Sequence, residues 1–319
     1  MKIAINGFGR IGRSVARIAY KNHELEINDI MPIEMAAYLL SHDTIRGDLN
    51  VEIENDTLVV DGKKIKYHNF KHPSQNSFES DVVIECSGKF LTSDEVEGYL
   101  KRSKKVIISA PANDDTPTYV LGVNENEYAG EKIISNASCT TNCLAPIAKI
   151  IDNHFRIKQG FITTIHSYTM DQKLLDSPNY RDYRRSRAAA SNIIPTFTGA
   201  AKAIYKVLPQ LKGKLDGRSV RVPVNNVSLL DFVVEVEKES SVDEVNNIIK
   251  QYVDHHILGI DEKYSVSSDI VNRSESSVFV PDLTQVNGHL FKIFSWYDNE
   301  WGYANRLVEM AEYILFGKK

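Results

Sequence analysis

The sequence has little cysteine and no apolar run long enough to cross a membrane. Among 319 residues there are three cysteines, Cys86, Cys139 and Cys143. Such sparse cysteine argues against a disulfide-stabilised secreted protein and favours a reducing compartment. The apolar stretch in "MKIAINGFGR" meets a glycine turn after four or five residues, and no run approaches the ~20 apolar residues of a membrane span. We therefore expect a cytoplasmic protein without a membrane partner.

The sequence also lacks a strong excess of charge of one sign. Its formal net charge is −4, which gives no basic field of the kind that nucleic acid or an anionic membrane attracts. We expect no nucleic-acid partner. With 42% hydrophobic and 25% charged residues, the composition is typical of a globular protein. A chain of this length favours two domains over one core.

Short apolar runs alternate with helical patterns through about residue 138. The pattern predicts an antiparallel hairpin around Asp61-Gly62. Strand and helix alternating with short loops indicate a doubly wound, mostly parallel sheet of Rossmann type in an α/β protein. The strands are expected at 2–6, 25–29, 81–88, 104–111, 118–123 and 132–136, and the helices at 13–22, 32–43 and 93–103.

Longer strands follow in the second half of the chain. They predict an α+β domain with a mainly antiparallel sheet. The polar stretch 170–192 has no strand or clean helical period over most of its length, and loops this long inside compact domains are usually functional or interfacial. The strands are expected at 160–169, 219–224, 227–236, 276–282 and 290–297, and the helices from Cys139 and at 198–211, 242–256 and 304–316.

The first strand ends in a glycine-rich turn that fits the pattern G-x-G-x-x-G. The turn follows a strand, opens a helix, and precedes Asp29 by 22 residues, which is the context of dinucleotide binding. Asp29 would accept hydrogen bonds from the adenosine ribose and repel a 2′-phosphate, which favours NAD over NADP. A tight turn with a stray acidic residue is the alternative. The turn comprises Gly7, Gly9, Arg10, Ile11 and Gly12, with backbone N–H groups of Arg10 and Ile11 facing the pyrophosphate.

Cys139 and Cys143 lie four residues apart in a segment, 133–148, that carries no charge. Metal binding fits poorly because no second Cys or His pair stands at zinc spacing, and i, i+4 positions on a helix do not suit a disulfide. A nucleophile fits better. Ser138 or Asn136 can cap a helix that places Cys139 in its first turn, where the helix dipole stabilises a thiolate. Cys143 and Cys86 are interpreted as packing residues.

A cysteine nucleophile requires a base, and His166 stands out on a strand flanked by hydroxyl side chains. A half-buried structural histidine is the alternative. Arg221 lies inside an apolar strand, where an unpaired cation would be costly, and Thr198-Gly199 can offer backbone N–H groups to an oxyanion. "RDYRRSR" supplies Arg181, Arg184, Arg185 and Arg187, which could instead form a solvated face or a subunit contact. Pro146 should kink the helix at Cys139 or end its first segment.

Several long segments together resemble the phosphorylating glyceraldehyde-3-phosphate dehydrogenase family (type I). They are "INGFGRIGR", "ECSGKF", "KKVIISAPA", "SNASCTTNCLAP", "TTIHSYT", "RRSRAAASNIIPTFTGAAKAI", "KGKLDGRSVRVP" and "WYDNEWGYANR". Their order and spacing also match, so the likeness runs from the first strand to the last helix. It implies a dinucleotide-binding domain of residues 1–138 and 303–319, and a catalytic domain of residues 139–302 that contains the S-shaped loop 170–192.

The resemblance implies oxidation of glyceraldehyde 3-phosphate by NAD in glycolysis or gluconeogenesis. Cys139 would be the nucleophile and His166 the general base. The thiol would add to the aldehyde, oxidation would leave a thioester, and inorganic phosphate would release the acyl phosphate 1,3-bisphosphoglycerate. The backbone N–H of Cys139 would help to hold the oxyanion, and an imidazole beside the thiol would lower the pKa of that thiol by forming an ion pair.

The resemblance also assigns residues to phosphate and cofactor. The first phosphate group is the substrate's own, and the second is the attacking phosphate, with Arg221 between the two sites. The S-shaped loop implies a homotetramer. Thr169, Arg185 and Arg221 would hold the first phosphate, Ser138, Thr140, Thr198 and Gly199 the second, and Asn299, Tyr303, Ser109 and Lys71 would contact the cofactor.

Two alternatives remain beside this reading. Erythrose-4-phosphate dehydrogenase has the same fold and nucleophile, although "SYTMDQ" and "TFTGAAK" resemble the glyceraldehyde phosphate enzyme more closely. A non-catalytic dinucleotide-binding scaffold is the other alternative. The chain departs from the family in a short second strand, in "IMP" after Asp29, in "RVPVNN" after Arg221 and in one extra residue before the arginines. The first two of these departures leave use of NADP open.

Overall fold

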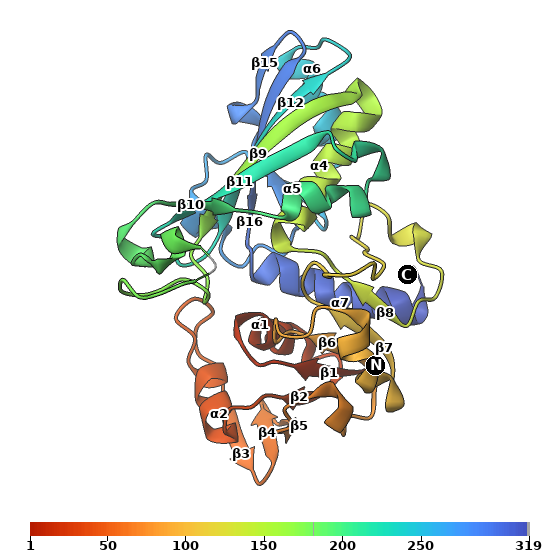
Figure 1. Cartoon of the computed structure of the whole chain (residues 1–319), viewed down its shortest axis with the longest axis vertical. Helices are drawn as coiled ribbons and strands as arrows, with labels where there is room; N and C mark the ends of the chain where they lie inside the picture. Colours follow the sequence, from red (N-terminus) through yellow and green to blue (C-terminus); the bar gives the residue numbers. More distant parts are fainter. Residues whose placement is uncertain (181, 318–319) are drawn as a thin grey trace. The chain divides into compact units, whose positions relative to one another are not determined.

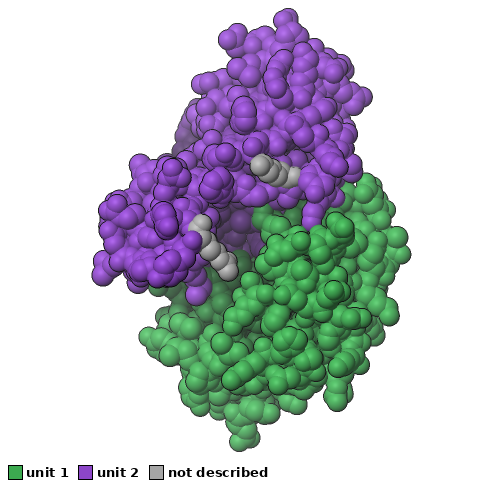
Figure 2. Space-filling view, viewed as in Figure 1, with its two compact units in different colours: residues 1–138, 304–319 green, residues 139–303 purple. Residues whose placement is uncertain are grey.

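The computed structural model describes residues 1–180 and 182–317 (Figure 1). The chain forms two compact units (Figure 2). Unit 1 contains residues 1–138 and 304–319, and unit 2 contains residues 139–303. Arg181, one of the arginines singled out in the sequence, lies outside the described residues.

Unit 1 is built on an eight-stranded sheet with the order β3-β4-β5-β2-β1-β6-β7-β8. The strands from β5 to β8 in this order run parallel to their neighbours, and β3-β4-β5 form an antiparallel edge. β1, β6 and β7 each contain three consecutive buried apolar residues, at 3–5, 82–84 and 106–108, as is typical where both faces of a parallel sheet are covered. The strands are β1 (Lys2–Asn6), β2 (Glu24–Asn28), β3 (Val51–Glu54), β4 (Thr57–Val60), β5 (Lys63–His68), β6 (Ser80–Glu85), β7 (Ser103–Ile108) and β8 (Ile133–Ser135).

The predicted hairpin is confirmed, and Asp61 and Gly62 both have positive φ at its turn. The expected strand at 118–123 is wrong. Only Thr118 bridges Ser135, and the side chain of Asn124 then bonds Val120 N and Thr118 O, which turns the chain. The helix expected at 93–103 is divided into α3 and a 3-10 segment. The helices of unit 1 are α1 (Arg10–Ala19), α2 (Ile33–Ser41), α3 (Ser93–Val96), the 3-10 segments η1 (Pro73–Gln75), η2 (Glu97–Lys101) and η3 (Glu125–Glu127), and all but the first turn of α7 (Trp301–Phe316).

Unit 2 has a second, mainly antiparallel sheet with the order β10-β11-β9-β12-β16-β14-β13, to which β15 adds at β16. Among the strand pairs that the structure describes in this sheet, β9–β11 and β13–β14 are parallel and the others are antiparallel. Alternating burial along β12 and β16 shows that one face packs against a core. The strands are β9 (Ile157–Ser167), β10 (Ile194–Phe197), β11 (Leu215–Val222), β12 (Ser228–Val236), β13 (Leu258–Ile260), β14 (Ser277–Phe279), β15 (Gln285–Asn287) and β16 (Leu290–Tyr297).

The central helix of unit 2, α4 (Cys139–Phe155), packs against β12, β14 and β16. It runs unbroken past Pro146, so of the two outcomes expected for this proline, a kink or the end of the first segment, the second does not occur. Burial on nearly all sides offsets the hydrogen bond that proline cannot donate. The helix expected at 198–211 is broken, since Pro209 starts a new 3-10 turn. The other helices are α5 (Ala200–Ala203), α6 (Val242–Lys250) and the 3-10 segments η4 (Tyr183–Ser186), η5 (Ala189–Ser191), η6 (Ile204–Lys206), η7 (Pro209–Leu211), η8 (Ser267–Ile270) and η9 (Pro281–Leu283).

Candidate functional site

The glycine-rich turn lies at the carboxyl end of β1, where the strand order of the sheet reverses between β2 and β6. Gly7 has φ +92°, and a Cβ there would lie 2.4 Å from the backbone N of Ser87. A Cβ at Gly12 would lie 2.0 Å from the carbonyl oxygen of Gly7. At Gly9 it would meet none of the described atoms within 4 Å. Two of these glycines are therefore needed by the turn itself, and the third leaves space beside the start of α1.

Asp29 directly follows β2 and faces this turn. Its Oδ2 accepts a hydrogen bond from Phe8 N at 2.6 Å, and its Oδ1 accepts one from Met31 N at 3.0 Å. The carboxylate thus ties the turn after β1 to the turn after β2. Both are positions at which open α/β sheets bind ligands, outside the carboxyl ends of their strands.

A buried polar network, which the sequence analysis missed, supports the same strand ends. Asn28 donates to Asn6 Oδ1 at 2.8 Å, and Asn6 donates to Glu85 Oε2 at 2.6 Å. Glu85 also accepts from Tyr99 OH and from Ser87 N, and burial raises the pKa of its carboxyl group. The sequence signal that could have revealed this network is that each of three buried strands ends in a polar residue, Asn6, Asn28 or Glu85.

Ser109 and Lys71 also follow strands of this sheet. Ser109 comes directly after β7, and its backbone N donates to Glu85 O at 3.0 Å. Lys71 is exposed in the loop after β5, and its backbone N donates to Gln75 Oε1. Both residues thus lie at the carboxyl edge of the sheet that carries the glycine turn.

These features fit a dinucleotide. Helix α1 starts at Arg10 after Gly9, which has no side chain to cap the first N–H groups, so these donors can receive a pyrophosphate. The open space at Gly9 lets a ligand approach the backbone. Asp29 supplies a carboxylate at the end of β2 for ribose hydroxyls. The backbone cradle and the carboxylate are therefore both in place.

Cys139 is the first residue of α4, as the sequence predicted. Two residues earlier Ala137 has φ +55°, a left-handed conformation that costs a residue with a Cβ roughly 1–2 kcal/mol. Its backbone N donates to Ser135 Oγ, which helps to hold this turn. Strained turns of this kind cluster at functional sites. The turn presents a partly buried cysteine at a helix N-terminus.

His166 lies on β9 with its Nε2 3.8 Å from Cys139 Sγ. Its Nδ1 lies 2.7 Å from Ser167 O and 2.6 Å from Arg221 Nη1, and Arg221 Nη1 also donates to Ser167 O at 2.9 Å. Parallel pairing of β9 with β11 places His166 and Arg221 side by side. Sulfur, imidazole and guanidinium thus form one contiguous group.

The two contacts of His166 Nδ1 require different tautomers of the neutral ring. When Nδ1 carries the proton it donates to Ser167 O, and the lone pair on Nε2 faces Cys139 Sγ. When Nε2 carries the proton, Nδ1 accepts from Arg221. Only the first tautomer can take a proton from the sulfur.

Burial controls the protonation of this pair. Burial, helped by the positive charge of Arg221, lowers the pKa of His166 to about 3. Burial raises the pKa of the Cys139 thiol, while Arg221 and hydrogen bonds from Thr140 and the backbone act in the opposite direction. The imidazole is neutral, so it forms no ion pair that would lower the thiol pKa, and burial is the largest influence on that pKa. The geometry offers a neutral base beside a thiol.

Tyr297, at the end of β16, was missed in the sequence. Its OH lies 2.9 Å from Thr140 Oγ1 and 2.7 Å from Thr164 Oγ1, and its ring meets the His166 ring edge-on at 6.0 Å. Tyr297 is buried, so these two hydroxyl groups serve as the hydrogen-bond partners that water would otherwise provide to its OH. Tyr297 thereby joins α4 to β9 next to both reactive side chains. No local motif marks such a residue in a sequence.

Arg221 has the properties of an anion-binding side chain. Its Nε is buried and finds no hydrogen-bond partner within residues 1–180 and 182–317. An unsatisfied donor on a buried cation is costly unless a ligand completes it. Ser138, at the same helix start, is partly exposed. The Thr140 hydroxyl contacts Tyr297, and both this hydroxyl and the backbone N–H of Thr140 also hydrogen-bond Cys139.

Thr198 and Gly199 precede α5, which has only four residues. The hydroxyl of Thr198 accepts a hydrogen bond from Ala200 N at 3.3 Å, so part of the expected donor set is used internally. Gly199 is exposed. The structure thus places these two residues at a helix start, although a shorter one than the sequence indicated.

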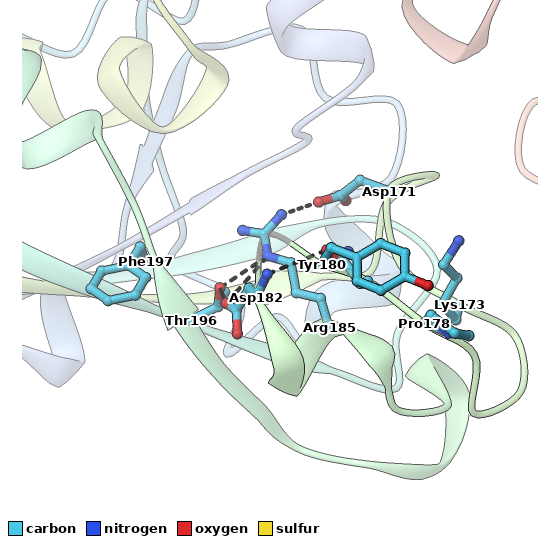
Figure 3. A pocket seen from close by; sticks show the side chains of 9 residues that line it. Asp171, Lys173, Pro178, Tyr180, Asp182, Arg185, Thr196 and Phe197 are labelled. Carbon is cyan, nitrogen blue, oxygen red and sulfur yellow. Dashed lines mark hydrogen bonds and ion pairs between the residues drawn. The ribbon is translucent and has the colours of Figure 1, made fainter.

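Thr169 and Arg185 are brought together by Asp171. Asp171 Oδ1 accepts from the Thr169 hydroxyl at 2.5 Å, and its Oδ2 pairs with Arg185 Nη1. Figure 3 shows the guanidinium between Asp171 and the pair of Asp182 and Thr196. A pocket of about 580 Å³ lies here, lined by Asp171, Asp182, Arg185 and Thr196 together with Lys173, Pro178, Asn179, Tyr180 and Phe197.

Asn299 is held between two strands of unit 2. Its Oδ1 accepts hydrogen bonds from Ser167 Oγ at 2.9 Å and Ser228 Oγ at 3.0 Å. With the carbonyl oxygen engaged, the amide NH₂ is the group left to donate to a ligand. Tyr303 is buried in the first turn of α7.

The other two cysteines differ from Cys139. Cys143 is fully buried one turn further along α4, 3.5 Å from Ser277 Oγ, and burial raises the pKa of its thiol to about 12. Cys86 directly follows β6 rather than lying in it, and burial again raises the thiol pKa to about 12. All three cysteines are free thiols. Packing is therefore the role that fits Cys143, as expected.

Comparison with known proteins gives one consistent family. The family model described as glyceraldehyde 3-phosphate dehydrogenase, NAD binding domain, matches residues 1–93, and the model of the C-terminal domain matches residues 138–299. Glyceraldehyde-3-phosphate dehydrogenase of Priestia megaterium is 49% identical over 329 aligned residues, which cover 98% of both chains. Relatives from Bacillus cereus and Aspergillus oryzae are 49% and 43% identical, each with 98% of both chains covered. The chain belongs to the glyceraldehyde-3-phosphate dehydrogenase family.

Proposed function

We propose that the chain oxidises D-glyceraldehyde 3-phosphate with NAD and inorganic phosphate to give 1,3-bisphosphoglycerate. The observation that carries this proposal is the cysteine at the start of α4 with a neutral imidazole 3.8 Å from its sulfur. The family matches support the substrate and the cofactor. Unit 1 is then the dinucleotide-binding domain, and unit 2 is the catalytic domain with the S-shaped loop 170–192.

The first step is addition of the Cys139 thiol to the aldehyde. His166 Nε2 takes the thiol proton while the Sγ–C1 bond forms, and returns it to the carbonyl oxygen, which gives a hemithioacetal. Backbone N–H groups at the start of α4 stabilise the oxygen while it is negative. Because its pKa is lowered, the His166 ring is neutral, and the lone pair on Nε2 is available to accept the proton.

The second step converts the hemithioacetal into a thioester. NAD, when bound, supplies the acceptor for the hydride that leaves C1. His166 takes the hydroxyl proton in this step, so the carbonyl forms as the C–H bond breaks. Inorganic phosphate then attacks the thioester carbonyl, the C–S bond breaks, and the Cys139 thiolate leaves with the electron pair. The acyl phosphate retains the energy that hydrolysis of the thioester would lose.

The cofactor would be held by Gly7, Gly9, Gly12 and the N–H groups of Arg10 and Ile11, with Asp29 on the adenosine ribose. The open space at Gly9 and the position of Asp29 support this assignment. The carboxylate of Asp29 favours NAD over NADP because a 2′-phosphate would face its charge. The remaining proposed contacts come from Lys71, Ser109, Asn299 and Tyr303.

Two phosphate sites complete the proposal. The C3 phosphate of the substrate would bind Thr169, Arg185 and Arg221, and the attacking phosphate would bind at Ser138, Thr140, Thr198 and Gly199. The unsatisfied Nε of Arg221 supports an anion at that side chain. Its position beside His166 would bring the anion close to the reacting sulfur.

Assembly and location follow from the same likeness. We propose a homotetramer in which loop 170–192 contacts a neighbouring subunit. The loop supports this by exposing large apolar side chains, with Met170, Leu174 and Leu175 between 78% and 84% exposed. Three free thiols fit a reducing cytoplasm. Within the described residues, no helix is long and apolar enough to span a membrane.

The test is steady-state NADH formation from glyceraldehyde 3-phosphate, with and without phosphate, in Cys139→Ser and Cys143→Ser variants. We expect Cys139→Ser to abolish turnover while NAD binding persists, and Cys143→Ser to stay active because its sulfur is buried in packing. Turnover of erythrose 4-phosphate tests the related activity. Near-normal rates in Cys139→Ser would exclude the covalent mechanism.

A further inference from the structure

Thr169 and Arg185, two of the three proposed ligands of the C3 phosphate, are both occupied by one carboxylate. Asp171 accepts a hydrogen bond from the Thr169 hydroxyl with Oδ1. Its Oδ2 pairs with Arg185 Nη1 (Figure 3). A carboxylate and a phosphoryl group use the same donors and the same bidentate geometry. Asp171 therefore lies where an incoming phosphoryl oxygen would bind.

The other side of Arg185 is held independently. Its Nε donates to Thr196 Oγ1 at 2.9 Å, and that hydroxyl donates to Asp182 Oδ2 at 2.5 Å. Asp182 Oδ2 also lies 3.8 Å from Arg185 Nε. The arginine thus keeps a defined orientation whether or not Asp171 is bound.

The two carboxylates differ in exposure. The side chain of Asp171 is 45% exposed and that of Asp182 only 14% exposed. An exposed ion pair contributes little free energy and exchanges readily with solvent, whereas the Asp182–Thr196 contact is packed. Asp171 is consequently the displaceable partner and Asp182 the fixed one.

A donor beside Thr169 is also unused. Gln172 is buried, its Oε1 accepts from Thr169 N at 3.3 Å, and its Nε2 has no hydrogen-bond partner within the described ranges. The backbone bond orients the amide with its NH₂ group free to donate. An anion held at Thr169 is a ligand that this group could complete.

We propose that Asp171 is an internal anion that competes with the phosphoryl group for Thr169 and Arg185 and so sets the affinity of this site. The inference rests on the proposed phosphate role of these two residues. A phosphoryl group binds only to the fraction of molecules in which Asp171 has released them, which weakens its apparent affinity by that fraction. The occupant is a phosphoryl dianion, either on the aldehyde or as inorganic phosphate.

The competing explanation is that Asp171 orients Arg185 for phosphate binding. The two explanations predict opposite signs for Asp171→Asn, which keeps the shape but removes the charge. Competition predicts tighter phosphoryl binding, by about three- to tenfold for an exposed pair of ordinary strength. Orientation predicts weaker binding.

The experiment measures the KM for glyceraldehyde 3-phosphate and the KM for inorganic phosphate separately. Titration calorimetry with inorganic phosphate adds a binding measurement without turnover. In Asp171→Asn we expect at least one of the two KM values to fall three- to tenfold, and the one that falls identifies the phosphoryl group. Asp171→Ser serves as a second variant if Asp171→Asn does not fold.

Matched variants separate the possible failures. Asp176→Asn lies in the same loop, where Asp176 pairs with exposed Arg187, and we expect no change in either KM. Asp182→Asn should raise KM because it loosens the fixed side of Arg185. Unchanged or raised KM values in Asp171→Asn would overturn the competition. Unchanged values in Arg185→Gln would instead refute the phosphate role of this arginine itself.

Discussion

Replacing Arg221 with glutamine should slow alkylation of the Cys139 thiol. The guanidinium lowers the pKa of this thiol against the effect of burial. Nη1 of Arg221 lies 2.6 Å from His166 Nδ1, and His166 Nε2 lies 3.8 Å from the sulfur. The two ring nitrogens of His166 are about 2.2 Å apart, so Nη1 of Arg221 is at most about 9 Å from the Cys139 sulfur. At an effective dielectric constant of about 20 this attraction contributes about 1.8 kcal/mol, or roughly 20-fold in thiolate fraction.

The assay is the second-order rate of reaction with iodoacetamide at pH 7 and low salt. Iodoacetamide is uncharged and needs no phosphate site, so its rate reports the thiolate. We expect a roughly 20-fold lower rate in Arg221→Gln and a smaller loss in Arg221→Lys, which keeps the charge. Arg218→Gln, on the same strand but with its guanidinium packed on the Phe197 ring, should leave the rate unchanged.

A second comparison separates the direct effect of Arg221 from an effect through the imidazole. In a His166→Asn background the Arg221→Gln change should reduce the rate by a similar factor, because the field acts on the sulfur itself. Equal rates with and without the Arg221 charge in both backgrounds would refute the electrostatic reasoning.

Three further results are expected. Gly12→Ala should lower the free energy of unfolding, measured by denaturant titration, by about 1–3 kcal/mol, because its Cβ would lie 2.0 Å from a backbone oxygen. Gly9→Ala should change the free energy of unfolding by no more than ~0.5 kcal/mol and should weaken NAD binding. Asp29→Ala should raise kcat/KM for NADP relative to NAD, and unchanged NADP kinetics would contradict its ribose role. Tyr297→Phe should destabilise the protein by about 1–3 kcal/mol in thermal melts, because two buried hydroxyls lose their partner. Tyr252→Phe, at the surface, should have little effect in the same assay.

The sequence predicted the elements whose signal is local. Buried strands such as β1 and β6 contain a run of three consecutive apolar residues, and the turn at Gly7 combines glycine spacing with strand and helix context. Cys139 was placed at a helix start because small polar residues precede an uncharged helical run. Composition and spacing are sufficient where neighbouring residues alone determine the conformation.

Long-range side-chain contacts were not predictable in this way. The segment 118–123 resembles a strand, but the Asn124 side chain turns it by bonding two backbone groups. Tyr297 hydrogen-bonds Thr140, which lies 157 positions away in the sequence, and no sequence motif predicts that contact. The effect of burial on the pKa of Cys139 was not predictable either, because a helix start is visible in a sequence and the desolvation of the site is not.

The central claim is that the sulfur of Cys139 carries the substrate covalently. The most direct test mixes the protein with NAD and glyceraldehyde 3-phosphate without phosphate, quenches in acid and examines the peptides by mass spectrometry. The account predicts a 3-phosphoglyceryl group on the peptide that contains Cys139, absent in Cys139→Ser and lost when phosphate is added before the quench. An unmodified Cys139, or an acyl group on Cys143 or Cys86 instead, would contradict it.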